Sequence, residues 1–305
     1  MRYRQIVPYG LSYGSTAALV YLRRYPSSVA RIMLEGVAPI DDKVPLGFAR
    51  GAQKALRSLE ADCAADPTCH QSFPNFAREF EVVNARINKR PLRVFVTGTG
   101  GKTLAVTLTH QVFVDRLRQM MYSSEGAGYV PLLIREAYRG NTRLLANTLL
   151  FMGRGLESGI AQGMFLSVTC AEDIPFIDER EIREQTRGTF YGDARIRAQQ
   201  AACRTWNVKP APRSFLQRFK SDVPALFLSG ADDPATPPWF AKALLRDFAR
   251  GRQVVFPHSG HELAGVCFNA IAVKFADTGK VDAGETCAGG LKRPAFATSL
   301  PAFLR

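Results

Sequence analysis

The segment Gly10-Leu11-Ser12-Tyr13-Gly14 places a serine hydroxyl between two glycines near the start of the chain. An apolar segment at residues 5–9 precedes it, and a helical pattern over residues 15–25 follows it. A tight turn between a strand and a helix exposes such a hydroxyl, and the next amide can bind a developing oxyanion. The pattern therefore predicts Ser12 as a nucleophile and the N–H of Tyr13 as an oxyanion donor. The alternative is an ordinary glycine-rich turn.

A serine hydroxyl becomes a good nucleophile when a histidine, itself oriented by a carboxylate, removes its proton. The chain contains four histidines, which are His70, His110, His258 and His261. His261 comes soon after the last predicted strand, so that a loop can carry it back over the serine. His258 is the competing candidate three residues earlier. We expect His261 to be the base, and structural roles for His70 and His110.

The orienting carboxylate should lie between the serine and the histidine in the sequence, just after a strand of the same sheet. Residues 223–229 form a nearly continuous apolar run that ends at Gly230, and Asp232 and Asp233 follow it directly. Either aspartate can supply the acid. The alternative is a turn aspartate that caps the helix expected to begin at Pro238.

Two groups of predicted strands position these candidates, and a long helical region separates them. Strands at residues 5–9 and 29–34, joined by the helix at 15–25, form a unit typical of a parallel sheet. The sheet resumes with strands at residues 223–229 and 253–256, and helices are expected over 238–248 and from Glu262 onward. The intervening region carries amphipathic patterns, with helices expected at 48–60, 76–88, 111–122 and 129–138 and a hairpin at 92–97 and 103–109.

Charge and motif content argue against several other functions. The formal charge of +13 is scattered, without any run of four basic residues, which disfavours a nucleic-acid interface. The segment Gly101-Lys102-Thr103 has Val96 where a phosphate-binding loop needs its first glycine. We expect neither a metal nor a cofactor, and no apolar run approaches the ~18 residues of a membrane span. The expected partner is a peptide or a small ester substrate.

Six cysteines fall into three local pairs by position, which are Cys63 with Cys69, Cys170 with Cys203, and Cys267 with Cys287. Other pairings are open, as are reduced and buried cysteines. An even count without a Cys-x-x-Cys motif favours disulfides over zinc. Because disulfides persist outside the cell or in the periplasm, we expect a secreted or periplasmic protein.

Six segments in order along the chain carry a family resemblance. They are YGLSYG at 9–14, YLRRYP at 21–26, LEGVAP at 34–39, CAADPTC at 63–69, VTCAED at 168–173 and GADDPATPP at 230–238. With the paired cysteines around His261, they resemble the tripeptidyl-aminopeptidase and proline-iminopeptidase-related branch of the α/β-hydrolases. The likeness extends over nearly the whole chain, and it lies in the order and spacing of the segments.

The resemblance implies an α/β-hydrolase fold in three parts. Residues 1–41 would form the core around the nucleophile, 42–221 a helical cap, and 222–305 the rest of the core with the acid and the histidine. It favours Asp233 over Asp232 as the acid. It also implies an exported serine peptidase that releases residues or short peptides from free N-termini, with Glu172 and Asp173 binding the ammonium group. The alternative for these two is an acidic helix cap beside a disulfide.

One departure concerns the second oxyanion donor, which this branch takes from a loop of His-Gly-Gly-Pro-Gly type that the chain does not contain. Only 11 residues precede Ser12. We therefore expect the early strands of the sheet, that loop and any signal peptide to lie outside this sequence. Two further hypotheses stay open, a carboxylesterase that uses the same Ser12, Asp233 and His261, and an inactive, N-terminally truncated remnant.

Overall fold

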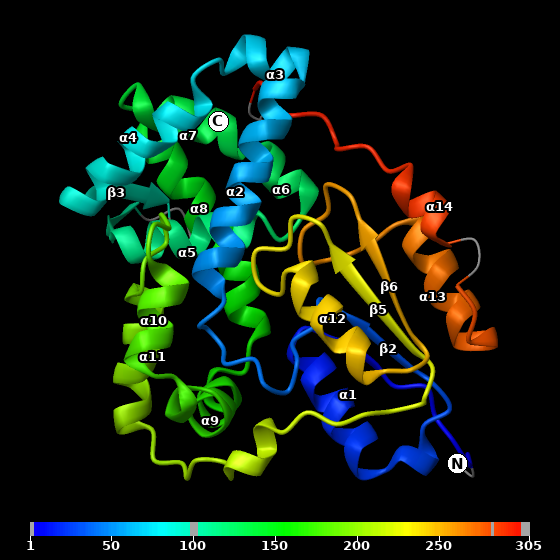
Figure 1. The fold of residues 1–305 in the computed structure, drawn as a ribbon. Helices are drawn as coiled ribbons and strands as arrows, with labels where there is room; N and C mark the ends of the chain where they lie inside the picture. Colours follow the sequence, from blue (N-terminus) through cyan, green and yellow to red (C-terminus); the bar gives the residue numbers. More distant parts are fainter. Residues whose placement is uncertain (1–2, 98–102, 282–283, 300–305) are drawn as a thin grey trace.

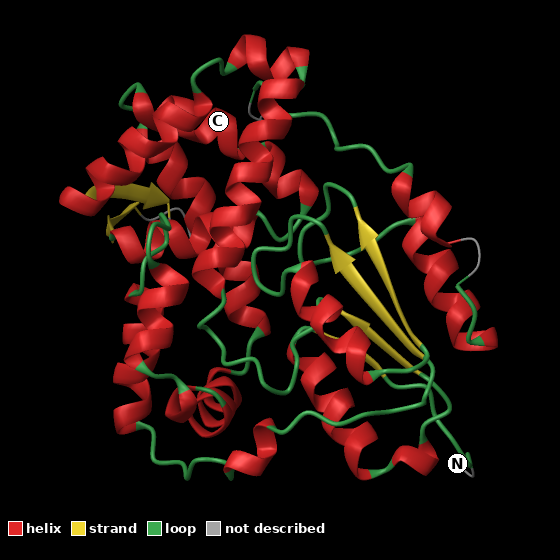
Figure 2. Ribbon diagram, viewed as in Figure 1, coloured by secondary structure: helices red, strands yellow, loops and turns green. Residues whose placement is uncertain are grey.

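A four-stranded parallel sheet forms the centre of the computed structural model, which describes residues 3–97, 103–281 and 284–299 (Figures 1 and 2). Each pair of neighbouring strands is parallel, as the strand–helix–strand pattern predicts. In sheet order the strands are β1 (Tyr9–Leu11), β2 (Ile32–Glu35), β5 (Ala225–Gly230) and β6 (Gly251–Phe256).

Helices cover both faces of the sheet because successive side chains of a strand point to opposite sides. In β5, Ala225 and Phe227 belong to one apolar core, whereas Leu226 and Leu228 belong to another. The first core is closed by α1 and α12 and the second by α13 and α14. These helices span Tyr13–Arg24, Pro238–Leu244, Val266–Thr278 and Gly284–Gly289.

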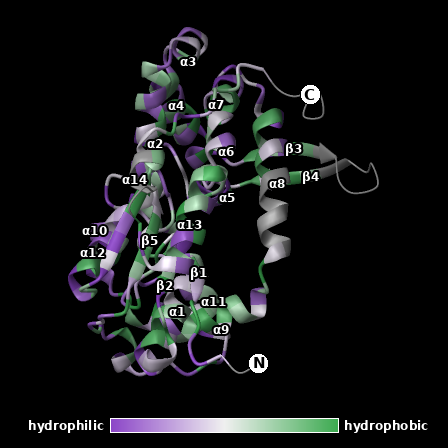
Figure 3. Ribbon diagram, turned by 90° about the vertical axis from the view of Figure 1, so that its right-hand side faces the viewer, coloured by the Kyte–Doolittle hydropathy of each residue, from purple (hydrophilic) through white to green (hydrophobic). Residues whose placement is uncertain are grey.

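The chain between β2 and β5 forms a largely helical region beside the sheet, with an extensive apolar core of its own (Figure 1). Figure 3 shows hydrophobic and hydrophilic residues mixed along these helices, as expected for amphipathic helices. The elements are α2 (Phe48–Ala65), α3 (Pro67–Ser72), α4 (Phe76–Lys89), β3 (Leu92–Thr97), β4 (Thr103–Leu108), α5 (His110–Met120), α6 (Ser124–Gly128), α7 (Val130–Tyr138), α8 (Thr142–Gly159), α9 (Gln162–Glu172), α10 (Glu179–Thr186) and α11 (Ala194–Thr205).

The hairpin predicted in this region is confirmed, since β3 and β4 pair antiparallel. Its connection at 98–102, which includes Gly101 and Lys102, lies outside the described residues. The domain boundaries at residues 41 and 221 stay predictions. None of the described helices combines the length and apolarity that a membrane crossing requires.

Three predicted element positions are wrong. The strand expected at 5–9 begins only at Tyr9, with Ile6 making an isolated bridge to Val29, because Pro8 has no N–H to donate to a strand ladder. The strand expected at 29–34 is displaced to Ile32–Glu35. The last long helix begins at Val266 rather than Glu262, and the preceding residues form the loop that carries His261.

The three disulfides join the cysteines that are paired by position in the sequence. Cys63–Cys69 links α2 to α3, Cys170–Cys203 links α9 to α11, and Cys267–Cys287 links α13 to α14. Each bond closes a loop within one region, so the three bonds brace pairs of adjacent helices.

The turn between β1 and α1 holds Ser12 in an unusual backbone conformation, with φ of 56° and ψ of −125°. A non-glycine residue pays about 1–3 kcal/mol for such strain, so the surroundings must enforce it. Gly10 lets the two arms of the turn approach closely, because a Cβ atom there would lie 2.2 Å from the carbonyl oxygen of Gly14. A Cβ atom at Gly14 would meet no atom within 4 Å.

This difference predicts opposite outcomes for two glycine-to-alanine variants of one motif. Gly10→Ala should lower the free energy of unfolding by about 2 kcal/mol or more, because its new methyl group overlaps backbone. Gly14→Ala should be neutral, or stabilise by up to about 1 kcal/mol, because alanine favours helix. Urea unfolding of both variants beside the unmodified chain measures this, and equal losses would contradict it.

Candidate active site

Ser12 lies on the wall of a cavity of about 640 Å³ between the sheet and the helical region. Its N–H donates to the carbonyl oxygen of Glu35 at 3.0 Å, which fixes the turn against the end of β2. Tyr13 is the first residue of α1, so its own N–H has no partner within that helix. An oxyanion formed beside Ser12 could accept this N–H.

His261 lies on the wall of the cavity and pairs with Asp233 behind it. The Nδ1 atom of His261 is 2.9 Å from Asp233 Oδ2, and the two residues are only 5% and 1% exposed. The N–H groups of Ala235 and Thr236 donate to the other carboxylate oxygen, at 2.7 and 2.9 Å. The Thr236 hydroxyl donates to Asp233 Oδ2 at 2.8 Å and lies 3.1 Å from His261 Nδ1. The carboxylate is thereby fixed in one orientation.

The charges of this buried pair support each other. Burial disfavours the charged imidazole, but the Asp233 carboxylate outweighs it, so the pKa of His261 is raised. Burial also disfavours the charged carboxylate, but His261 and the two N–H donors outweigh this effect, so the pKa of Asp233 is lowered. Such a carboxylate can orient a histidine and stabilise its positive charge.

Glu35 and Gly36, at the end of β2, contact the serine turn and the loop that carries His261, although the sequence did not single them out. Glu35 is 2% exposed. One of its carboxylate oxygens accepts the N–H of Leu263 at 2.8 Å, and the other accepts the Tyr9 hydroxyl. A Cβ atom at Gly36 would lie 2.8 Å from the His261 ring. The signal for Glu35 was a charged residue in an otherwise apolar strand.

Three carboxylates line another part of the cavity. Glu172 and Asp173, the predicted ammonium ligands, are both there, and Asp42 joins them. Burial raises the pKa of Asp173 to about 8, with further contributions from Asp42 and Glu172. Burial likewise raises the pKa of Asp42 to about 7, and that of Glu172 is also raised. The Tyr13 hydroxyl donates to Glu172 at 3.2 Å, which ties this acidic group to the serine turn.

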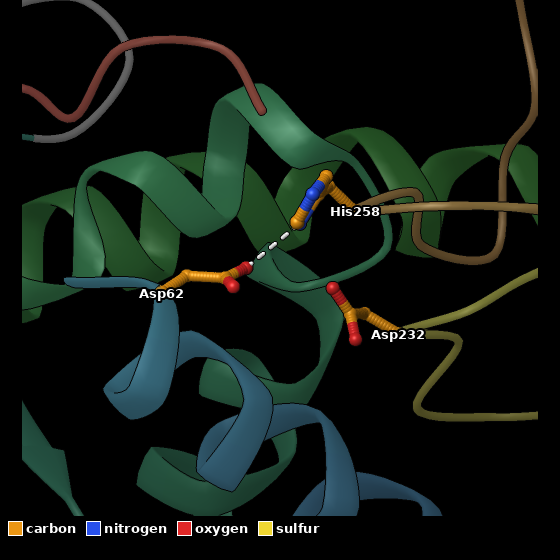
Figure 4. A group of neighbouring side chains, drawn as sticks. All are labelled: Asp62, Asp232 and His258. Atoms are coloured by element: carbon orange, nitrogen blue, oxygen red, sulfur yellow. Dashed lines mark hydrogen bonds and ion pairs between the residues drawn. The ribbon is translucent and has the colours of Figure 1, made fainter. Parts of the chain in front are cut away.

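The competing candidates Asp232 and His258 lie in a different cluster. Together with Asp62 they offer three metal-ligand atoms within 4.8 Å of one another (Figure 4). Arg293 donates to both carboxylates, however, at 2.9 Å in the case of Asp232, while His258 Nδ1 lies 3.0 Å from Asp62. The carboxylates are thus already paired with a guanidinium, and the cluster ties α2 to the loops that carry Asp233 and His261.

The remaining histidines lie away from the cavity wall. His110 is the first residue of α5, and its Nε2 atom lies 2.8 Å from Asn84 Oδ1. Burial lowers the pKa of His110. His70 is exposed on α3. The side chain that packs on His261 is instead Tyr122, whose ring centre lies 4.8 Å from that of the imidazole. Because neither His70 nor His110 lines the cavity, neither can act on Ser12 in this arrangement.

The chain is similar to one sequence family and to a group of curated proteins that share one name. A sequence model described as TAP-like protein matches residues 188–287, a segment that contains both Asp233 and His261. Curated relatives named serine protease Hip1, from Mycobacterium bovis and from two strains of Mycobacterium tuberculosis, are 26% identical over 284 residues. The match covers 83% of this chain and 51% of each relative, so the chain spans about half the length of these proteins.

Solved structures that resemble the chain include a meta-cleavage product hydrolase, CumD, with 12% identity and a TM-score of 0.31 over 85% of this chain and 59% of the other. The serine hydrolase CCSP0084 from Cycloclasticus zankles has 13% identity and the same TM-score over 85% and 58%. These scores carry no weight by themselves. The parallel sheet, the strained serine turn and the family model matched over residues 188–287 agree with one another, and together they support a serine hydrolase of the α/β-hydrolase fold that is similar to TAP-like proteins.

Proposed function

We propose that this chain is the catalytic part of an exported serine aminopeptidase that acts on free peptide N-termini. Ser12 Oγ attacks the scissile carbonyl carbon while His261 accepts its proton, and Asp233 stabilises the resulting imidazolium. The N–H of Tyr13 stabilises the oxyanion. His261 then protonates the leaving amine, and water hydrolyses the acyl-enzyme by the same steps. The second oxyanion donor stays a prediction.

The observation that carries this proposal is one cavity whose wall includes Ser12, His261 and the neighbouring carboxylates of Asp42, Glu172 and Asp173. A substrate ammonium group in a partly closed cavity pairs strongly with carboxylates, since the local dielectric is lower than that of water. The raised pKa values of Asp42 and Asp173 reflect burial without enough compensating positive charge. A small ester without an amine would make no use of these groups, which favours the peptidase over the carboxylesterase.

Two further observations support the substrate class and the location. The curated relatives are named serine proteases, which favours a peptide bond as the one cleaved. All six cysteines are paired in disulfides, and stable disulfides are rare in reducing compartments. Secretion or transfer to the periplasm agrees with these disulfides.

A free amine should be decisive for the substrate. N-acetylation of an aminoacyl anilide should lower kcat/KM by about 10-fold or more, the value of one charge-assisted contact. Ser12→Ala should lower kcat/KM by at least about 10³-fold, while the exposed Ser214→Ala serves as the matched control. Equal rates on free and acetylated anilides, with p-nitrophenyl acetate cleaved faster than either, would favour the esterase and contradict the proposal.

Asp173 should contribute to binding at the expense of stability. Asp173→Asn should raise KM for free-amine substrates by about 10-fold and leave acetylated ones unchanged. The Asp173 pKa rises from 3.8 to about 8 in the folded chain, so the folded state holds an extra proton between these values and loses stability as pH rises through that window. Asp173→Asn should therefore raise the melting temperature at pH 8.

The matched control is Asp222→Asn, which removes an exposed carboxylate away from the cavity. In the unmodified chain, KM for a free amine should fall as the pH rises from about 6 to about 8, because the pKa values of Asp42 and Asp173 are about 7 and about 8. A fall in melting temperature of the Asp173→Asn variant at pH 8, with KM unchanged, would assign Asp173 a structural role instead.

Thr236 should set the basicity of His261 through Asp233. Thr236→Val removes a donor to the oxygen that faces His261, so the carboxylate attracts the imidazolium more strongly. The acid limb of the kcat/KM profile should move to higher pH by roughly half a unit. Thr236→Ser, which keeps the hydroxyl, should restore the original profile. A profile that does not move in the valine variant would contradict this role.

A further inference from the structure

Another part of the cavity wall carries arginines on either side of a single carboxylate, Asp115. Helix α5 presents Gln111, Asp115, Arg118 and Gln119 to the cavity, with the four- and three-residue spacing of one helical face. Arg195, near the start of α11, lies on the same wall. We call the group formed by Asp115, Arg118 and Arg195 the arginine end of the cavity.

The guanidinium groups of this end are incompletely paired. Arg118 is 4% exposed, and its Nε atom is 3.7 Å from Asp115 Oδ1. The Nε atom of Arg195 is 3.9 Å from Asp115 Oδ2. Both distances exceed that of a hydrogen bond, and both Nε atoms are buried without a hydrogen-bond partner.

One carboxylate therefore faces two guanidinium groups, and it also accepts the hydroxyl of Tyr191. Arg118 also donates a 2.6 Å hydrogen bond to the Tyr122 hydroxyl. Arg195 otherwise lies over the ring of Phe165, 5.7 Å from its centre. A buried charged group that is incompletely paired is costly, and the negative charge of an anion in the cavity would offset part of that cost.

Helix α9 sets the separation between the arginine end and the acidic group. Arg195 lies beside Phe165, and Gln199 donates to Thr169 at 2.8 Å, so α9 and α11 run alongside each other. Glu172 comes seven residues after Phe165 on α9, which is about 10 Å at 1.5 Å per residue. The same distance spans roughly three residues of an extended peptide.

We propose that the arginine end binds a carboxylate of the substrate, so that the cavity accepts short peptides by their amine at one end and by a carboxylate at the other. The proposal rests on the proposed function in the same cavity. Arginine suits this role because its planar group can donate two parallel hydrogen bonds to a carboxylate. The carboxylate can be the C-terminus of a short peptide or an acidic side chain. Two different pairs of substrates distinguish these two sources.

The test compares matched tripeptides on the full chain. One pair is Ala-Ala-Ala with a free C-terminus against its C-terminal amide, and the other is Ala-Ala-Glu amide against Ala-Ala-Gln amide. Hydrolysis is followed by release of new amines. Binding is followed separately by calorimetry, with analogues in which reduced amide bonds prevent cleavage. A preference for the free acid identifies the C-terminus, and a preference for glutamate identifies the side chain.

The variant to use is Arg195→Gln, because Arg195 is less buried than Arg118 and its loss is better tolerated. In the favoured pair of peptides, Arg195→Gln should reduce the binding preference for the carboxylate peptide by about 10- to 100-fold. The affinity for the neutral peptide of that pair should change less than about twofold. Arg195→Lys keeps the charge without the planar group and should recover part of the preference. Arg204→Gln removes an exposed charge from the same helix, away from the cavity, and should change nothing.

The binding measurement separates the two proposals. Carboxylate-dependent binding that Arg195→Gln abolishes, without any hydrolysis, would contradict the aminopeptidase and keep the carboxylate site. Equal binding of the acid and neutral members of both pairs would overturn the carboxylate site, even with free-amine peptides cleaved. A loss of preference in Arg204→Gln equal to that in Arg195→Gln would also overturn it, since general charge would then account for the effect.

Discussion

The buried contact between His261 Nδ1 and Asp233 Oδ2 depends on a carboxylate that stays ionised away from water. An isolated buried carboxylate would take up a proton instead. Asp233 avoids this because two backbone N–H groups and the Thr236 hydroxyl donate to it in addition to the imidazole. The turn after β5 is thus shaped around one side chain, and the position of His261 follows from that turn.

The parallel sheet brings this pair to the serine. All four strands run in the same direction, so the loops that follow β1, β2, β5 and β6 meet at one edge. Ser12 comes from the first loop, Gly36 from the second, Asp233 from the third and His261 from the fourth. The absence of a side chain at Gly36 is what allows the imidazole to lie against β2. The helical region closes the other side of the cavity with Tyr122 and with charged groups of both signs.

The sequence predicts best what depends on local patterns. The strand–turn–helix around Ser12 follows from two glycines and a change of periodicity, and the disulfides join cysteines that are near neighbours in the chain. Asp42, Glu35 and Arg195 could not be chosen in the same way, because each becomes part of the site only through packing between distant segments. His258 and Asp232 show the reverse, since both stand next to the expected positions and yet pair with Asp62 and Arg293. Their side chains point to another side of the loops, although they stand only three residues from His261 and one residue from Asp233 in the sequence.

Covalent labelling of the intact chain with a fluorophosphonate, followed by peptide mass spectrometry, tests most directly whether His261 and Asp233 activate Ser12. The reagent reacts with a serine only when a base activates the hydroxyl and an oxyanion site receives the phosphoryl oxygen. We expect one adduct per chain, located on Ser12 and formed at a rate that falls steeply in Asp233→Asn and His261→Ala. A folded, monodisperse chain that stays unlabelled, or that carries the adduct on another serine, would contradict this activation.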